Sequence, residues 1–314
     1  MKFFAAILIT NSHMGSIYPE RFNLLATGGA IGDALFFFCS GYLLMMGRNM
    51  DFLNWYKRRV NRIFPTIFAV ALIGIVVFGG DPTLRHVIIH GGGWFVQAIF
   101  VFYAIFWFVK RYLSDRLWIA YAINIAVVLI WFIWFWDKNV FILYNGTYLR
   151  WPCYFMIMLM GASVFKHEKR IEGKNNGRLF VVLLVVSLLF YYGFQLIWGR
   201  IPVLKTIQII LLPALMAIIF CIYKICSSKK VLGAYTSKYV YWPLYYISAC
   251  CLEIYLSGGW SFVVGKNLIG LFPLNVIVTF LMIFVVAYLV KVFSNFLSQT
   301  FKTESYDWIK MVKL

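Results

Sequence analysis

The stretch KFFAAILITNSH, residues 2–13, opens the chain with an apolar segment that carries one cation and one imidazole. Lys2 and His13 are eleven positions apart. In an α-helix this spacing is close to three turns and about 16 Å of rise, so both side chains fall on nearly the same face. Ionisable groups inside a membrane are costly and mark candidate functional sites. The stretch therefore predicts a helix with a positive charge near a membrane surface and a titratable base deep in the bilayer.

The composition of the whole chain is that of a membrane protein. Of its 314 residues, 63% are hydrophobic and 20% are aromatic, whereas only 13% are charged. The core of a soluble domain cannot absorb so much apolar surface. We therefore predict an all-α polytopic membrane protein, with residues 1–314 forming a single integral-membrane domain and no soluble domain on either side.

A hydropathy window of about 20 residues indicates ten candidate transmembrane helices. The first of them is short, because twelve residues give only about 18 Å of helix against a hydrocarbon layer of about 30 Å. Either this helix enters from the interface and ends within the membrane, or the natural N-terminus lies upstream of Met1; we favour the second. The ten predicted spans cover residues 2–13, 27–47, 63–80, 87–109, 117–136, 149–165, 179–198, 204–226, 239–257 and 271–296.

The distribution of positive charge predicts the orientation. A net charge of +18 would suggest nucleic acid as the partner of a soluble protein, but here 22 of the 29 Lys and Arg residues fall inside if the first helix starts in the cytoplasm. Positive-inside bias then predicts that both termini are cytoplasmic, with membrane lipids and no nucleic acid as partners. The seven cations that fall outside are Arg21, Arg85, Lys138, Arg150, Arg200, Lys205 and Lys266.

The six cysteines lie in or beside apolar segments and show no metal-type spacing. We interpret them as small buried hydrophobic residues and predict no metal site. They are Cys39, Cys153, Cys221, Cys226, Cys250 and Cys251.

Asp33 is the predicted partner of His13. It lies in the next apolar span, within GGAIGDALFFFCSGYLL (residues 28–44). A bare carboxylate in a membrane costs several kcal/mol, and a nearby imidazole would satisfy it. The carboxylate would in turn orient the imidazole and make it more basic. The alternatives are a helix-cap or interfacial role for Asp33 and a structural, hydrogen-bonded role for His13.

A basic cluster follows in FLNWYKRRVNRIFP, residues 52–65. Arg62 is three residues after Arg59 and four after Arg58, so all three side chains can share one face of a helix. Guanidinium groups bind phosphate oxygens in a bidentate manner. The cluster therefore predicts either a site for an anionic cytosolic ligand or a contact with anionic lipid headgroups.

Two further features lie in later spans. The fourth contains HGGGWFVQAIFVFYAIFWF, residues 90–108, in which three glycines precede Trp94. Such glycines permit close backbone approach or a bent helix, and the tryptophan could contact a substrate or lie in an interfacial belt. Glu253 is a further intramembrane acid, which we expect to be paired within the bundle.

Taken in order, these motifs resemble the membrane acyltransferase 3 family, whose O-acyltransferases modify surface polysaccharides. Residues 2–13 look like the family's Arg, ten residues, His motif, and GDALFFFCSGYLL (32–44) resembles its second-helix pattern. WYKRRVNRIFP (55–65) resembles the family's Arg-rich stretch ending in Arg-Ile-aromatic-Pro, and GGGWFVQAIFVFY (91–103) its Trp-Phe segment. Specific motifs therefore cover residues 2–110, while the remainder agrees only in span number and orientation.

Two departures from the family pattern affect the site. Lys2 replaces the usual arginine, which keeps the charge but loses the bidentate fork. GAYTSKYVYWPLYYI (233–247) resembles a late family motif but has Leu244 where that motif has a histidine. His13 is therefore the better placed base.

The resemblance implies a multi-pass protein of a bacterial cytoplasmic (inner) membrane that takes an acyl group, acetyl by default, from cytosolic acyl-CoA, with no bound cofactor. The acceptor would be a hydroxyl of a cell-surface or exported glycan, free or lipid-linked. His13 would act as the base and Asp33 would orient it. Donor phosphates would be held by Lys2, Arg58, Arg59 and Arg62. Further candidates for oxyanion or substrate contacts are Asn11, Ser12, Ser40 and Trp94.

An alternative from another class is a lipid-linked glycan transporter, or an export partner without acyl-transfer chemistry. It would use the same basic cluster for a pyrophosphate and the intramembrane acids for proton coupling. Loss of His13 distinguishes the two hypotheses, because a transporter would tolerate it better than an acyltransferase whose base it is.

Overall fold

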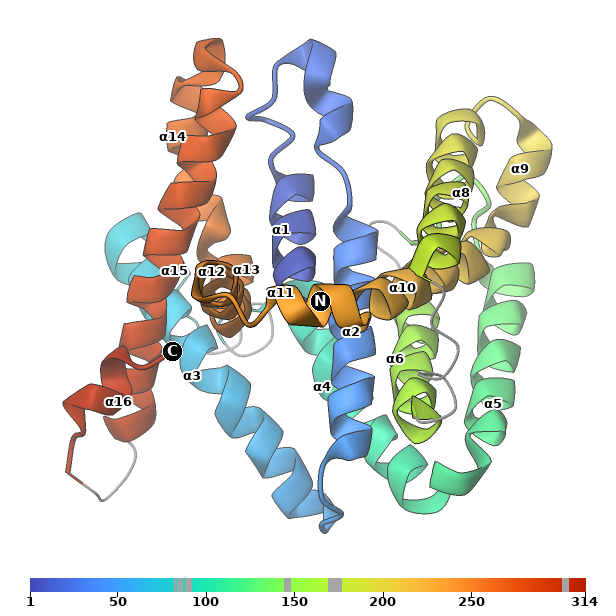
Figure 1. The fold of residues 1–314 in the computed structure, drawn as a ribbon, viewed down its shortest axis with the longest axis horizontal. Coiled ribbons are helices and arrows are strands. Elements are labelled where there is room, and N and C mark those ends of the chain that lie inside the picture. The colour runs from blue at the N-terminus through green and yellow to red at the C-terminus, as the bar shows by residue number, and fades with distance from the viewer. Residues whose placement is uncertain (82, 84–86, 88–91, 144–147, 169–176, 301–304) are drawn as a thin grey trace. The chain divides into compact units, whose positions relative to one another are not determined.

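The computed structural model describes residues 1–314 except 82, 84–86, 88–91, 144–147, 169–176 and 301–304 (Figure 1). Within the described residues the chain forms helices and connecting segments, without strands. It divides into two compact units, which we describe separately. Apart from Met1, unit 1 comprises Ala30–Asn49 and Ile105–Val240; unit 2 comprises Lys2–Gly29, Met50–Ala104 and Tyr241–Leu314.

The prediction of an all-α polytopic membrane protein is confirmed. The described residues contain seven helices long and apolar enough to cross a membrane, or eight if the bent pair Lys238–Ala249 and Cys251–Asn267 counts as one span. This is fewer than the ten predicted, because two predicted spans form shorter helices. The helix Lys2–His13 has 12 residues and the helix Arg150–Lys166 has 17.

Unit 1 is a bundle around helix α6 (Arg150–Lys166), which buries ten of its residues. Helix α6 packs on α5 (Leu117–Ile130) and on α10 (Leu211–Cys226), and α10 packs extensively on α8 (Gly177–Ile197). The other described elements of unit 1 are α2 (Gly29–Met46), η3 (Ser114–Arg116), η4 (Trp131–Phe135), α9 (Pro202–Ile207), η5 (Gln208–Ile210) and α11 (Lys229–Ala234).

Small residues bring helices α2 and α6 into backbone contact. A Cβ added at Gly41 of α2 would collide with the carbonyl oxygen of Met158, and one added at Gly161 of α6 would collide with that of Phe38. Glycine allows this close approach, which is a common basis for helix packing in membranes. The part of α2 around Ser40 is thus held by main-chain contacts.

Unit 2 is built on the long helix α15 (Leu274–Thr300), which packs against α3 (Phe52–Phe78) and α13 (Cys251–Ser257). Helix α1 (Lys2–His13) packs on α13 as well. Helix α4 (Gly93–Tyr112) begins in this unit and ends in unit 1. The other elements are η1 (Glu20–Leu25), α12 (Lys238–Ala249), η6 (Gly258–Ser261), α14 (Phe262–Asn267), η7 (Ile269–Leu271) and α16 (Trp308–Val312).

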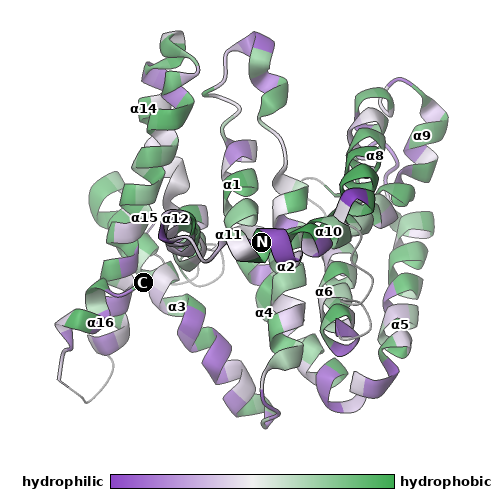
Figure 2. Ribbon diagram, in the orientation of Figure 1, coloured by the Kyte–Doolittle hydropathy of each residue, from purple (hydrophilic) through white to green (hydrophobic). Residues whose placement is uncertain are grey.

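Helix α3 has 27 residues and starts well before the apolar span predicted for it. The Asp51 side chain caps its first turn by accepting a hydrogen bond from the Asn54 backbone N–H at 3.0 Å, a typical N-cap contact. Gly79 follows its last residue with φ 66°, the left-handed conformation that ends many helices. The basic cluster therefore lies on the helix itself, and Figure 2 shows polar residues gathered in the first half of α3.

Candidate functional site

Helices α1 and α13 form the frame of the site in unit 2. They pack side by side. Lys2, at the start of α1, lies close enough to Cys251 at the start of α13 for its charge to act on the thiol. His13, at the end of α1, lines one cavity with Tyr255 and Leu256 near the end of α13. The two helices therefore run in the same direction, and the site has a Lys2 end and a His13 end.

The His13 end is a cavity of about 330 Å3. Its walls come from α1, from the start of α4, and from the segment that runs from α13 into α14. His13 itself is exposed, so its imidazole is accessible to a molecule in the cavity. Residues that share the cavity with it include Ile9, Thr10, Gly93, Tyr255, Gly259 and Phe262.

Gly93, directly before Trp94, makes a close backbone approach, one of the two possibilities that the sequence indicates. Gly93 has φ 61°, a backbone conformation that residues other than glycine rarely adopt. A Cβ at this position would lie 3.3 Å from the Tyr255 hydroxyl oxygen. Gly91 lies outside the described residues. Trp94 is half-buried and makes an edge-to-face contact with Phe95, at 6.0 Å between ring centroids. His90 lies outside the described residues.

Asn11 and Ser12 fix the end of α1. The Asn11 amide donates to the backbone oxygens of Leu25 at 2.7 Å and Thr27 at 3.0 Å, so both of its N–H bonds are used. Ser12 donates to the Ile9 carbonyl at 2.7 Å, one turn back in the same helix. These bonds hold the chain next to His13, and they leave Asn11 without an N–H for the oxyanion contact suggested by the sequence.

Arg59 of α3 lies close to two aromatic rings. Its guanidinium carbon is 4.7 Å from the ring centroid of Trp55 and 6.0 Å from that of Tyr103. Trp55 is buried and donates from its indole nitrogen to the Tyr103 carbonyl at 3.1 Å, which ties the two rings together. Such cation–π contacts orient a guanidinium without neutralising it.

Three of the four predicted donor-binding cations gather at the Lys2 end. The charges of Lys2 and Arg62 both lie near enough to act on Cys251, and those of Arg62 and Arg59 near enough to act on Tyr103. Arg58 is exposed one position before Arg59 and repels its charge. The structure thus brings Lys2 from α1 together with the arginines of α3, although about 60 residues separate them in the sequence.

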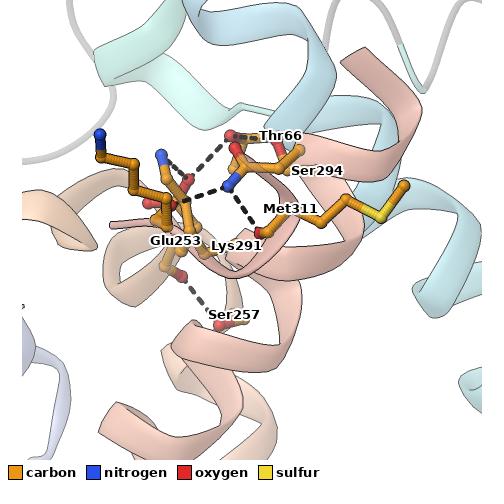
Figure 3. Close-up of polar contacts among 8 residues, drawn as sticks. Thr66, Glu253, Ser257, Lys291, Ser294 and Met311 are labelled. Carbon is orange, nitrogen blue, oxygen red and sulfur yellow. Dashed lines mark hydrogen bonds and ion pairs between the residues drawn. The ribbon is translucent and has the colours of Figure 1, made fainter. Parts of the chain in front are cut away.

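Glu253 of α13 is paired, as the sequence predicts (Figure 3). Its Oε1 accepts from Lys291 Nζ of α15 at 3.1 Å and from the Thr66 hydroxyl of α3 at 3.0 Å. Thr66 Oγ1 also lies 3.0 Å from the Ser294 hydroxyl. The Glu253 side chain is only 1% exposed, and these contacts compensate its burial.

Asp33 and Ser40 belong to unit 1. Both are half-buried on α2, and seven residues, or about two turns, separate them. The cation that acts on the Asp33 carboxyl is Arg150 at the start of α6. The pairing of Asp33 with His13 stays a prediction, as does the role of Ser40.

Sequence reasoning missed several residues of the site. Trp55 could have been found, because it lies one helical turn before Arg59. Tyr103, Cys251 and Lys291 could not, since no local spacing connects them to the first helix or to the basic cluster. Cys251 and Lys291 reach the site through the packing of α1, α3, α13 and α15, and Tyr103 lies on α4.

Comparison with protein families supports the same assignment as these motifs. A family model described as an acyltransferase domain matches residues 1–294. Comparison with curated proteins and with solved structures gives no significant match. The family match covers nearly the whole chain, from α1 into α15, and its helices are those of a multi-pass membrane protein. The chain therefore belongs to the acyltransferase 3 family of membrane acyltransferases.

Proposed function

We propose that the protein is an O-acyltransferase of a bacterial inner membrane. It moves an acyl group, in the simplest case acetyl, from cytosolic acyl-CoA to a hydroxyl of a surface or exported glycan, free or lipid-linked. The observation that carries the proposal is the arrangement along α1. Cations gather at the Lys2 end, and His13 lines a cavity at the other end of the same helix.

The length of α1 fits the donor. The phosphates of acyl-CoA would bind to Lys2, Arg59 and Arg62, with the fork of each guanidinium matching a phosphate. From there the pantetheine arm would follow α1, whose rise of about 16 Å between Lys2 and His13 is of the order of the extended arm. The thioester carbonyl would then lie beside the imidazole of His13.

His13 would act as the general base. Neutral imidazole removes the proton of the acceptor hydroxyl while the hydroxyl oxygen attacks the thioester carbonyl. The tetrahedral intermediate collapses with cleavage of the carbon–sulfur bond, and the imidazolium returns its proton to the departing CoA thiolate. General base catalysis of this kind contributes about 10²- to 10⁴-fold. An acyl-His intermediate is the second route, in which donor and acceptor bind in turn.

The test is the O-acetyl content of the surface glycans of the host, measured by NMR. A deletion strain receives wild type, His13→Ala, His13→Gln or the control Lys310→Met, whose side chain is exposed on the short helix α16. We expect wild type and the control to restore the acetyl signal and both His13 variants to restore almost none, at matched membrane levels.

The same experiment tests the alternative function. Full acetylation with a His13 variant would show that His13 is not the base. Unchanged acetylation in the deletion strain, together with impaired glycan export, would favour a transporter or an export partner without acyl-transfer chemistry.

A further inference from the structure

Lys291 of α15 lies among the cations at the Lys2 end of the site. The charged groups of Lys2, Arg62 and Lys291, which come from three different helices, and that of Glu253 all lie close enough to Cys251 to act on its thiol. Helix α15 brings Lys291 there because it packs against both α3 and α13. In the sequence, Lys291 follows Lys2 by almost the whole chain, and no motif connects the two residues.

The charges around Cys251 are not balanced. Three ammonium or guanidinium groups accompany one carboxylate, so the cluster carries a surplus of positive charge. Glu253 cannot compensate the other cations, since its Oε1 is taken by Lys291 and Thr66, and its Oε2 is buried without a hydrogen-bond partner among the described residues. A partly buried surplus of positive charge attracts an anion.

The Lys291 ammonium is the accessible member of its ion pair. Its side chain is 24% exposed, whereas that of Glu253 is 1% exposed. An ammonium has three N–H donors, and the bond to Glu253 at 3.1 Å uses one of them. Glu253 is itself held by Thr66, which contacts Ser294 in turn (Figure 3), so the position of the ammonium is fixed from inside the bundle.

We propose that Lys291 binds a phosphate group of the acyl-CoA donor together with Lys2 and Arg62, and that Glu253 positions it. The inference rests on the proposed function, because it names a further residue of the same donor site. The ligand chemistry is a phosphate, and both CoA and an anionic lipid headgroup carry one. Of the two we commit to CoA, because the predicted donor-binding residues Lys2 and Arg62 are in the same cluster.

The experiment measures CoA binding to the full-length protein in phosphatidylcholine nanodiscs. The main variant combines Lys291→Met with Glu253→Gln, so that no unpaired carboxylate remains buried. Lys291→Arg keeps the positive charge, and Lys310→Met is the control for loss of an exposed lysine. Melting temperatures establish that each variant is folded.

We expect the double variant to bind CoA about tenfold or more weakly, because it loses one hydrogen bond to a charged group. Lys291→Arg and Lys310→Met should bind as wild type does. Because the double variant removes one positive and one negative charge, the net charge of the cluster is unchanged, and the expected loss is that of the Lys291 donor itself. Normal binding by Lys291→Arg distinguishes this loss from a general effect of substitution at this position.

Three results would contradict one or both proposals. If the folded double variant binds CoA as wild type does, Lys291 is not part of the donor site. If its CoA affinity is unchanged but it no longer retains phosphatidylglycerol in native mass spectrometry, the phosphate belongs to a lipid headgroup. If wild type does not bind CoA at all, the proposed donor is wrong, and the proposed function fails together with the inference.

Discussion

Among single residues, Arg59 shows that the neighbours of a charged side chain matter as much as its charge, because they restrict its conformation. The Arg59 guanidinium contacts the rings of Trp55 and Tyr103, and its Nε is buried without a hydrogen-bond partner among the described residues. An arginine without such support would lose side-chain entropy on binding a phosphate. In the donor site that we propose, the two rings would reduce this cost, because they already restrict the guanidinium.

We predict that Trp55→Leu weakens CoA binding severalfold. The substitution removes a cation–π contact of the kind that contributes about 0.5–2 kcal/mol. Trp55→Phe keeps a ring under Arg59 but loses the hydrogen bond to the Tyr103 carbonyl, so its affinity should fall between those of wild type and Trp55→Leu.

The matched control is Trp308→Leu on α16, where the tryptophan is 73% exposed. It should leave CoA binding unchanged in the same titrations. Equal affinities for wild type and Trp55→Leu would show that Arg59 does not need its aromatic neighbours in order to bind the donor, or does not bind it.

At the scale of elements, glycines decide which helices touch. Gly41 and Gly161 allow main-chain contact between α2 and α6, whereas a Cβ at Gly193 of α8 would meet no heavy atom within 4 Å. The two kinds of glycine look alike in the sequence, since both lie inside apolar helices. Their difference comes from the neighbouring helix.

We predict that Gly161→Ala destabilises the protein by about 1–3 kcal/mol, because α6 must move away from the Phe38 carbonyl or distort. Gly193→Ala should be neutral or stabilise the protein by up to about 1 kcal/mol, as alanine favours a helix interior. Thermal melting of the purified variants in detergent measures both effects. A similar melting temperature for the two variants would contradict the close α2–α6 contact.

The helices also show how much of the fold and of the candidate site could be predicted from the sequence. The predicted bounds of α1 are correct, because the polar residues Lys2 and His13 mark the two ends of the apolar run. The hydropathy window predicts a span that starts at residue 63, whereas α3 begins at Phe52. The window stops at charged residues even where the helix continues. Lys291 and Cys251 could not be assigned to the site, because only tertiary packing brings them to Lys2.

At the scale of the whole molecule, the distribution of positive charge predicts that both termini are cytoplasmic. A C-terminal fusion to green fluorescent protein should therefore fluoresce, and a fusion to alkaline phosphatase at the same position should be inactive in the host. Green fluorescent protein fluoresces only in the cytoplasm, and alkaline phosphatase is active only in the periplasm. The two fusions therefore give independent reports on the side of the membrane where the C-terminus lies. An active phosphatase fusion would place the C-terminus outside.

The glycines of the His13 cavity have a consequence for what it can recognise. Gly92, Gly93, Gly258 and Gly259 all line it, so much of its wall is bare main chain. Peptide groups that face a cavity within a membrane need polar partners. A wall of this kind offers N–H and C=O groups at short range and no fixed charge. For the glycan acceptor that we propose, such a wall would suit a neutral, hydroxyl-rich ring, because one face of a sugar would lie flat against the main chain while an edge hydroxyl points at the imidazole.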